Sequence, residues 1–130
     1  MIEPEFLQLE EVLALHEQQV DSFGGTLGLR ERGLLESAVA MPQAAFGGHF
    51  VHEGLFAMAA AYAFHIAENQ PFVDGNKRTG LLAALVFLDL NGVFLADPEE
   101  RLYQAMIDIA ERRLTKGGLA TLMRTLVATR

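Results

Sequence analysis

The sequence predicts an all-α domain built on two buried central helices, with a short extended hairpin before them. Residues 55–69 and 76–90 are apolar on nearly every side, which is typical of helices surrounded by other helices. Residues 42–53, in contrast, lack a helical period and contain two adjacent glycines. The chain has 130 residues and is half hydrophobic, so we expect one domain, over residues 1–130, with one continuous core.

Amphipathic helices are predicted on either side of this central pair. Residues 9–22 place one apolar face inward, and the glycines at 24 and 25 end that helix. Residues 31–41 form a second helix, which Pro42 ends. Near the C-terminus, Asp97 can cap a helix with Pro98 at its first position, running to about Arg112. A last helix follows the glycines at 117 and 118 and continues through Val127.

The segment before the first central helix is predicted to be a hairpin or flap. The glycine pair at 47 and 48 can turn the chain between two short apolar stretches. The residues expected on this flap are Phe46, Gly47, Phe50 and Val51.

Composition excludes several classes of function. The formal net charge of −7 argues against a basic face that binds nucleic acid. The absence of cysteine excludes a disulfide scaffold and thiol catalysis, and fits a reducing compartment. The longest apolar runs are shorter than the roughly 20 residues that span a bilayer, and the first residues do not resemble a signal peptide. We therefore expect a cytoplasmic protein without membrane or nucleic-acid partners.

One loop, residues 70–80, carries the chemistry. Asp74 offers a carboxylate of the kind that Mg²⁺ prefers, and Gly75 lets a phosphate approach the backbone. The first turn of the following helix would present free N–H groups and two cations to an anion, in the order Asn76, Lys77, Arg78, Thr79. The alternative interpretation is a solvated helix start capped by Asp74 or Asn76. The residues alone leave both interpretations open.

The loop resembles the signature of the Fic/Doc (Fido) family, specifically its Doc, or death-on-curing, branch. That signature runs His-x-Phe-x-Asp-Gly/Ala-Asn-Lys-Arg, and the matching residues are Phe72, Asp74, Gly75, Asn76, Lys77 and Arg78. Further resemblance to the Doc branch lies in residues 28–30, 33–38, 42–43, 46–47 and 87–92. Nearly the whole chain is therefore covered.

The resemblance implies a helical Fic/Doc fold that binds ATP and Mg²⁺ and transfers part of the nucleotide to a protein hydroxyl. It implies that Arg78 and Asn76 hold phosphates and that Asp74 binds Mg²⁺. Lys77 follows the Doc branch, whose toxins phosphorylate elongation factor Tu, whereas Fic enzymes transfer AMP. Phosphoryl transfer is therefore the favoured activity, and AMP transfer is the alternative.

The resemblance also implies two protein partners. In the family a flap docks the target by strand addition, a role that we assign here to residues 46–51. Many Fic enzymes carry an internal inhibitory Ser/Thr-x-x-x-Glu-Gly/Asn segment, and this sequence lacks that pattern. A Phd-type antitoxin, supplied as a separate chain, is therefore the expected inhibitor.

Gln70 is the point at which the sequence departs from the family pattern, because the family has a histidine there that acts as general base. A neutral amide can donate and accept hydrogen bonds but cannot take up a proton near pH 7. Three hypotheses follow: an engineered silencing of a toxin, a natural protein that binds nucleotide or partner without catalysis, or a different base. His65 is the only histidine close in sequence that could serve as that base.

Overall fold

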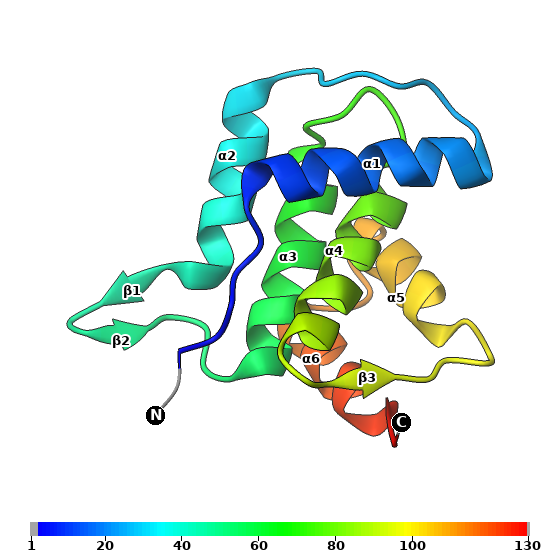
Figure 1. Ribbon diagram of the computed structural model, residues 1–130. Helices are drawn as coiled ribbons and strands as arrows, with labels where there is room; N and C mark the ends of the chain where they lie inside the picture. Colours follow the sequence, from blue (N-terminus) through cyan, green and yellow to red (C-terminus); the bar gives the residue numbers. More distant parts are fainter. Residues whose placement is uncertain (1–2, 130) are drawn as a thin grey trace.

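The two predicted central helices form the middle of the computed structural model, which describes residues 3–129 (Figure 1). Helix α3 spans Leu55–Asn69 and helix α4 spans Asn76–Leu90, which confirms the predicted limits of both. The loop between them, 70–75, turns the chain back, so that the two helices run antiparallel (Figure 1).

Small residues let α3 and α4 pack closely. A Cβ atom at Gly80 would lie only 2.7 Å from the carbonyl oxygen of Ala63, which is too close for any side chain. Around this contact the core is rich in fully buried alanines: Ala59, Ala60, Ala63, Ala83 and Ala84. Because the backbones approach at Gly80, the first turn of α4 is fixed against the last two turns of α3.

Helix α1 spans Leu9–Phe23 and helix α2 spans Arg32–Ala40, and both confirm the predicted amphipathic helices. Helix α1 lies across the upper end of the central pair, and α2 flanks α3 (Figure 1). Pro42 does not end α2 directly, because it lies in a single 3₁₀ turn, Met41–Gln43, that follows. Proline suits that turn, since its fixed φ fits the start of a helical segment.

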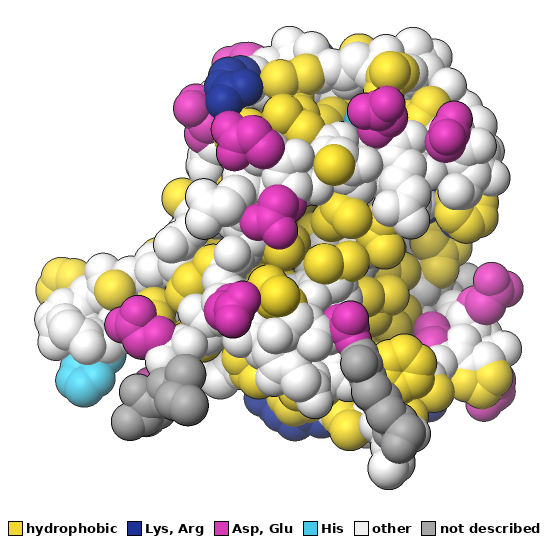
Figure 2. All heavy atoms as spheres, viewed as in Figure 1, with side chains coloured by type: hydrophobic (Ala, Val, Ile, Leu, Met, Phe, Trp, Pro, Cys, Tyr) yellow, Lys and Arg dark blue, Asp and Glu magenta, His cyan; other side chains and the backbone are white. Residues whose placement is uncertain are grey.

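The hairpin is confirmed as a structure. Strand β1, Ala45–Phe46, pairs antiparallel with β2, His49–Phe50, and the glycines at 47 and 48 turn the chain with positive φ values of 61° and 81°. The hairpin stands out from the body of the molecule (Figure 2). Phe46 in strand β1 is 86% exposed.

The C-terminal third differs from the prediction in two ways. Helix α5 spans Arg101–Ala110 and begins later than expected, because Glu100 takes a left-handed conformation and leaves Pro98 outside the helix. Asp97 still caps the helix, although it lies four residues before the helix begins. Its two carboxylate oxygens accept hydrogen bonds from the backbone N–H groups of Arg101 and Leu102, at 2.9 and 2.8 Å.

Helix α6 spans Lys116–Thr125 and includes the two glycines that were expected to precede it. The Thr115 hydroxyl caps α6 by accepting the Gly118 N–H. Val127 lies beyond the helix in strand β4, Val127–Ala128, which pairs with β3, Phe94–Leu95. These two-residue strands were not predicted, since so short a pair leaves no alternating pattern in the sequence. Within residues 3–129, no helix combines the length and the apolar character needed to cross a membrane.

A cluster of basic side chains joins α3 to α6. The Lys116 ammonium donates to Nε2 of His52 at 2.8 Å and to Nε2 of His65 at 3.1 Å. Burial, reinforced by the Lys116 charge, lowers the pKa of His52 and lowers the pKa of His65 to about 4. Glu68 opposes the shift at His65 but is itself paired with Arg112. Both imidazoles are therefore neutral acceptors at neutral pH.

We predict that Gly80→Ala destabilises the protein by roughly 1–3 kcal/mol, because the new methyl group must push the α3 backbone away. Gly33→Ala is the matched control, since it lies in α2 with nothing near the added Cβ, and should be neutral or stabilising by up to about 1 kcal/mol. Urea unfolding of both variants measures the difference. Equal stabilities would contradict the close packing of α3 on α4.

We also predict that stability falls as the pH drops from about 6.5 towards 4. Both histidine pKa values are lower in the folded protein than in the unfolded chain, so the unfolded chain takes up protons first in this range. The slope is at most about 1.4 kcal/mol per pH unit for each histidine. Urea unfolding at several pH values measures how the free energy of unfolding changes with pH. We expect a smaller change per pH unit in a His52→Gln/His65→Gln variant, in which only the carboxylates still titrate in this range. An unchanged slope would show that the cluster does not titrate as described.

Candidate functional site

Residues 24–31, between α1 and α2, lie over the loop that connects α3 to α4 (Figure 1). The backbone of the two segments forms a short antiparallel bridge between Leu29 and Phe72. The Val73 N–H donates to the Gly28 carbonyl at 3.0 Å, and the Arg30 N–H donates to the Pro71 carbonyl at 2.6 Å. The loop is therefore held from above, while Phe72 is buried beneath it.

A polar cavity of about 490 Å³ opens beside this loop. Most of the predicted site residues line it: Gln70, Asp74, Gly75, Asn76, Lys77 and Arg78. The end of α1 and the adjoining glycines form part of the wall, together with Tyr103 of α5. Residues from four helices, α1, α3, α4 and α5, and from two loops thus face one space.

The first turn of α4 is open to this cavity. Gly75 precedes the helix with a left-handed φ of 76°, and no side chain caps the helix N-terminus. Neither Asp74 nor Asn76 therefore caps the helix, which was part of the alternative interpretation of this loop. Within residues 3–129 neither Lys77 nor Arg78 forms an ion pair, so both cations remain available to an anion that binds at the exposed N–H groups.

Asp74 ties the loop to the segment above it. One carboxylate oxygen accepts the Gly75 N–H at 2.9 Å, and the other accepts the Thr26 N–H at 3.2 Å. Each oxygen keeps a lone pair for a metal ion. Because residues 3–129 contain no group of three potential ligands, a Mg²⁺ ion here would need phosphate oxygens to complete its shell.

The Asn76 side chain bonds the loop that precedes its helix. Its side-chain oxygen accepts the Phe72 N–H and its side-chain nitrogen donates to the Phe72 carbonyl, both at 3.0 Å. The amide thus holds the loop with one of its two N–H donors, and the second N–H donor is left for a phosphate.

Gln70 lines the cavity from a strained backbone conformation, with φ and ψ of 48° and 57°. The Arg30 side chain stabilises this turn by donating to the Gln70 and Asn69 carbonyls at 2.9 and 3.3 Å. Among residues 3–129 no histidine lines the cavity. His65 binds Lys116 on another side of α3, so the structure does not support it as a replacement base.

Two other predicted features lie outside the cavity. Thr79 is fully buried within the core and does not line it. The β1–β2 hairpin, with Phe46, Gly47 and Phe50 and with Val51 beside it, precedes the N-terminal end of α3, whereas the loop follows its C-terminal end. Because a helix of 15 residues is about 22 Å long, the hairpin and the loop lie at opposite ends of α3. The segment beside the loop is instead residues 24–31.

His16 belongs to this site but is not among the predicted site residues. Its ring stacks on Phe72, with centroids 3.7 Å apart and planes inclined by 4°, and its Nε2–H donates to the Asp74 carbonyl at 2.8 Å. Thr26 was missed as well, because backbone contacts leave no residue-type signal. For His16 a signal was available: a histidine on the inward face of α1 needs a buried partner.

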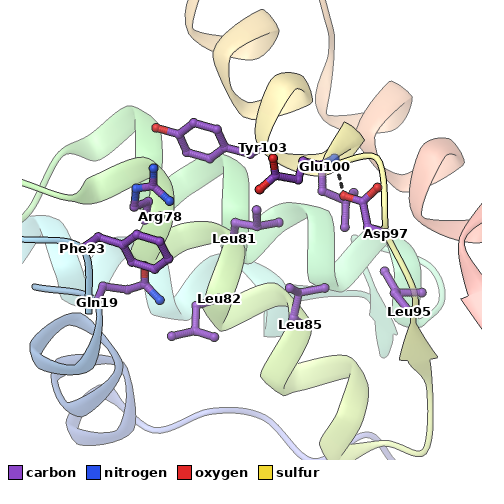
Figure 3. A pocket seen from close by; sticks show the side chains of 11 residues that line it. Gln19, Phe23, Arg78, Leu81, Leu82, Leu85, Leu95, Asp97, Glu100 and Tyr103 are labelled. Atoms are coloured by element: carbon purple, nitrogen blue, oxygen red, sulfur yellow. Dashed lines mark hydrogen bonds between the residues drawn. The ribbon is translucent and has the colours of Figure 1, made fainter. Parts of the chain in front are cut away.

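A second cavity, of about 240 Å³, lies on the other side of Arg78 (Figure 3). It is mostly apolar and runs between α1, α4 and α5, with leucines of α4 at its base and Asp97 and Glu100 at its rim. Three residues line both cavities: Phe23, Arg78 and Tyr103. The Arg78 guanidinium lies between the two rings, 4.1 Å from the Phe23 centroid and 4.4 Å from the Tyr103 centroid (Figure 3).

We predict that His16→Ala lowers stability by roughly 2–4 kcal/mol, because it removes a buried stacking contact and leaves the Asp74 carbonyl without its donor. His16→Phe, which keeps the stack but loses the hydrogen bond, should fall in between. His49→Ala, on the exposed hairpin, is the control and should change stability by less than about 0.5 kcal/mol. Thermal unfolding of the three variants is the measurement, and a wild-type melting curve for His16→Ala would refute this role.

The sequence matches a known protein family and two of its members. Residues 6–88 match the Fic/DOC family. The chain is 46% identical over 92 residues to a protein named Toxin Doc from Mycolicibacterium smegmatis, covering 71% of this chain and 68% of that one. It is 32% identical over 117 residues to Protein kinase doc of Escherichia phage P1, covering 90% and 91% of the two chains. The helical fold, the loop and the extent of these matches show that the chain belongs to the Fic/DOC family.

Proposed function

We propose that this protein is a Doc-type toxin whose site transfers phosphate from ATP to a hydroxyl of elongation factor Tu in the cytoplasm, and that Gln70 impairs the transfer. The observation that carries the proposal is the polar cavity at the open N-terminus of α4, lined by Lys77 and Arg78. The names of the two relatives, a toxin and a protein kinase, favour this activity over others of the family.

The site supplies what phosphate binding needs. The free N–H groups of the first turn of α4 can donate to phosphate oxygens, and the helix dipole favours negative charge there. Lys77 adds a point charge, and Arg78 can bind two oxygens at once. Mg²⁺ held by Asp74 and the nucleotide would neutralise charge that develops on the phosphates.

The loop is rigid before any ligand arrives. Asn76 fixes it from one side, His16 from beneath and Thr26 from above. Charge stabilisation in phosphoryl transfer depends on such fixed geometry, because donors that are already in place need no reorganisation during the reaction.

Gln70 affects a different part of the reaction. In this proposal it occupies the position from which a base would take the proton of the attacking hydroxyl, and an amide cannot do so. Nucleotide binding would then be retained while the rate of transfer falls by about 10²–10⁴-fold. AMP transfer in the manner of Fic enzymes would use the same cavity, with a different phosphate under attack.

A second candidate function is a silent module that binds nucleotide or a Phd-type antitoxin without catalysis. The observation that favours it is the absence, among residues 3–129, of any histidine lining the cavity. In either case we propose an antitoxin as partner, since a toxin that lacks an internal inhibitory segment needs a separate chain to restrain it.

We predict that Gln70→His raises phosphate transfer from γ-labelled ATP to purified elongation factor Tu by about 10²–10⁴-fold, because it restores a base. Incorporation of label from α-labelled ATP instead would identify AMP transfer. The control is Gln70→His/Arg78→Ala, which should lose the gain because it removes the phosphate ligand.

Calorimetry with ATP–Mg²⁺ separates the two candidate functions. Binding to the parent protein that is lost in Arg78→Ala, with no transfer even in Gln70→His, would establish the silent module. Absence of nucleotide binding in both parent and Gln70→His would overturn the kinase and the nucleotide-binding module together.

A further inference from the structure

Arg78 stands out among the cavity residues because of what holds it. Within residues 3–129 its guanidinium forms no ion pair, and no hydrogen bond to it is present. Its contacts are the rings of Phe23, the last residue of α1, and Tyr103, in α5 (Figure 3). An arginine side chain free in solvent would populate many rotamers, each with its charge in a different place.

We propose that Phe23 and Tyr103 form an aromatic clamp that positions Arg78 for phosphate binding. Both residues are positioning residues, because they act on the ligand through Arg78. This inference rests on the proposed function, since it names what orients the phosphate-binding arginine of the same site.

The chemistry of stacking suits this role. A guanidinium that lies against a ring offers its flat face to the π electrons, while its N–H donors remain in the plane and point outward. Those in-plane donors are the ones that bind two phosphate oxygens. An ion pair to a carboxylate would fix the arginine equally well, but it would occupy the same donors and weaken the positive charge.

The exposure of Phe23 supports the clamp. Phe23 is 60% exposed, so it contributes little to the core, and its contact with Arg78 is the interaction that the structure gives to this ring. Tyr103 is half-buried and reaches Arg78 from the opposite wall. Because the clamp draws on α1, α4 and α5, the position of Arg78 depends on how these three helices sit together.

The test uses variants that remove or keep each ring. Phe23→Leu and Tyr103→Leu, singly and combined, remove the stacking surface, whereas Phe23→Tyr and Tyr103→Phe keep it. In protein labelled with ¹⁵N-arginine, the Arg78 Nε–H signal is assigned by its loss in Arg78→Lys. We expect this signal to be ordered and ring-shifted in the parent and in the ring-keeping variants, and to become mobile and lose its shift in the leucine variants.

Binding of inorganic pyrophosphate with Mg²⁺, measured by calorimetry, connects this order to ligand affinity. We expect about 3- to 30-fold weaker binding for each leucine variant and little change for Phe23→Tyr and Tyr103→Phe. An unchanged Arg78 signal in the double leucine variant would overturn the clamp, as would unchanged affinity despite a mobile Arg78. Failure of the parent to bind pyrophosphate or ATP would instead overturn the proposed function, while the Arg78 signal would still report whether the rings hold the side chain.

Discussion

The close packing of α3 against α4 at Gly80 is the constraint on which the rest of the structure depends. The absence of a side chain at Gly80 lets the α4 backbone reach the Ala63 carbonyl, and this contact lies one turn beyond Lys77 and Arg78. The first turn of α4 is therefore anchored in the core at its inner side, while its outer side faces the polar cavity. A phosphate site at a helix N-terminus needs this arrangement, since the N–H groups must stay in place when a charged ligand draws them outward.

The loop before α4 is fixed by interactions that leave its ligand-binding groups free. Asn76 and His16 hold the loop through backbone carbonyls and N–H groups, and Asp74 does so with lone pairs to spare. Arg78 is held by a different interaction, because its guanidinium carbon lies 4.1 and 4.4 Å from the centroids of two aromatic rings, which accept no conventional hydrogen bond from its N–H donors. A charged side chain is usually held in place by a hydrogen-bond or ion-pair partner, and that partner then occupies the donors or acceptors that a ligand would need. In this site, the contacts that hold the charged groups in place are not made with the donors and lone pairs that would bind a ligand.

Much of the fold was predictable from the sequence because its determinants are local. The bounds of α3 and α4 follow from continuous apolar stretches ended by polar loop residues, and the hairpin follows from the glycine pair at 47 and 48. The start of α5 was misplaced because Asp97 caps from four and five residues away, across a left-handed Glu100 that no local preference indicates. The β3–β4 pair was invisible for a similar reason, because its partners lie far apart in the chain and each strand has only two residues.

The site was predictable in its residue types but not in its geometry. The signature identified which residues face the cavity, yet it could not show that the side chain of Asn76 is engaged with Phe72 or that Thr79 is buried. Position along the chain also gave no sign of which segment lies over the loop. The hairpin directly precedes α3 in sequence, but α3 then carries the chain away from it for its full length, so that residues 24–31 reach the loop instead. The Leu29–Phe72 bridge and the backbone hydrogen bonds around it therefore fix the loop that carries Asp74, because they join two segments that are far apart in the chain.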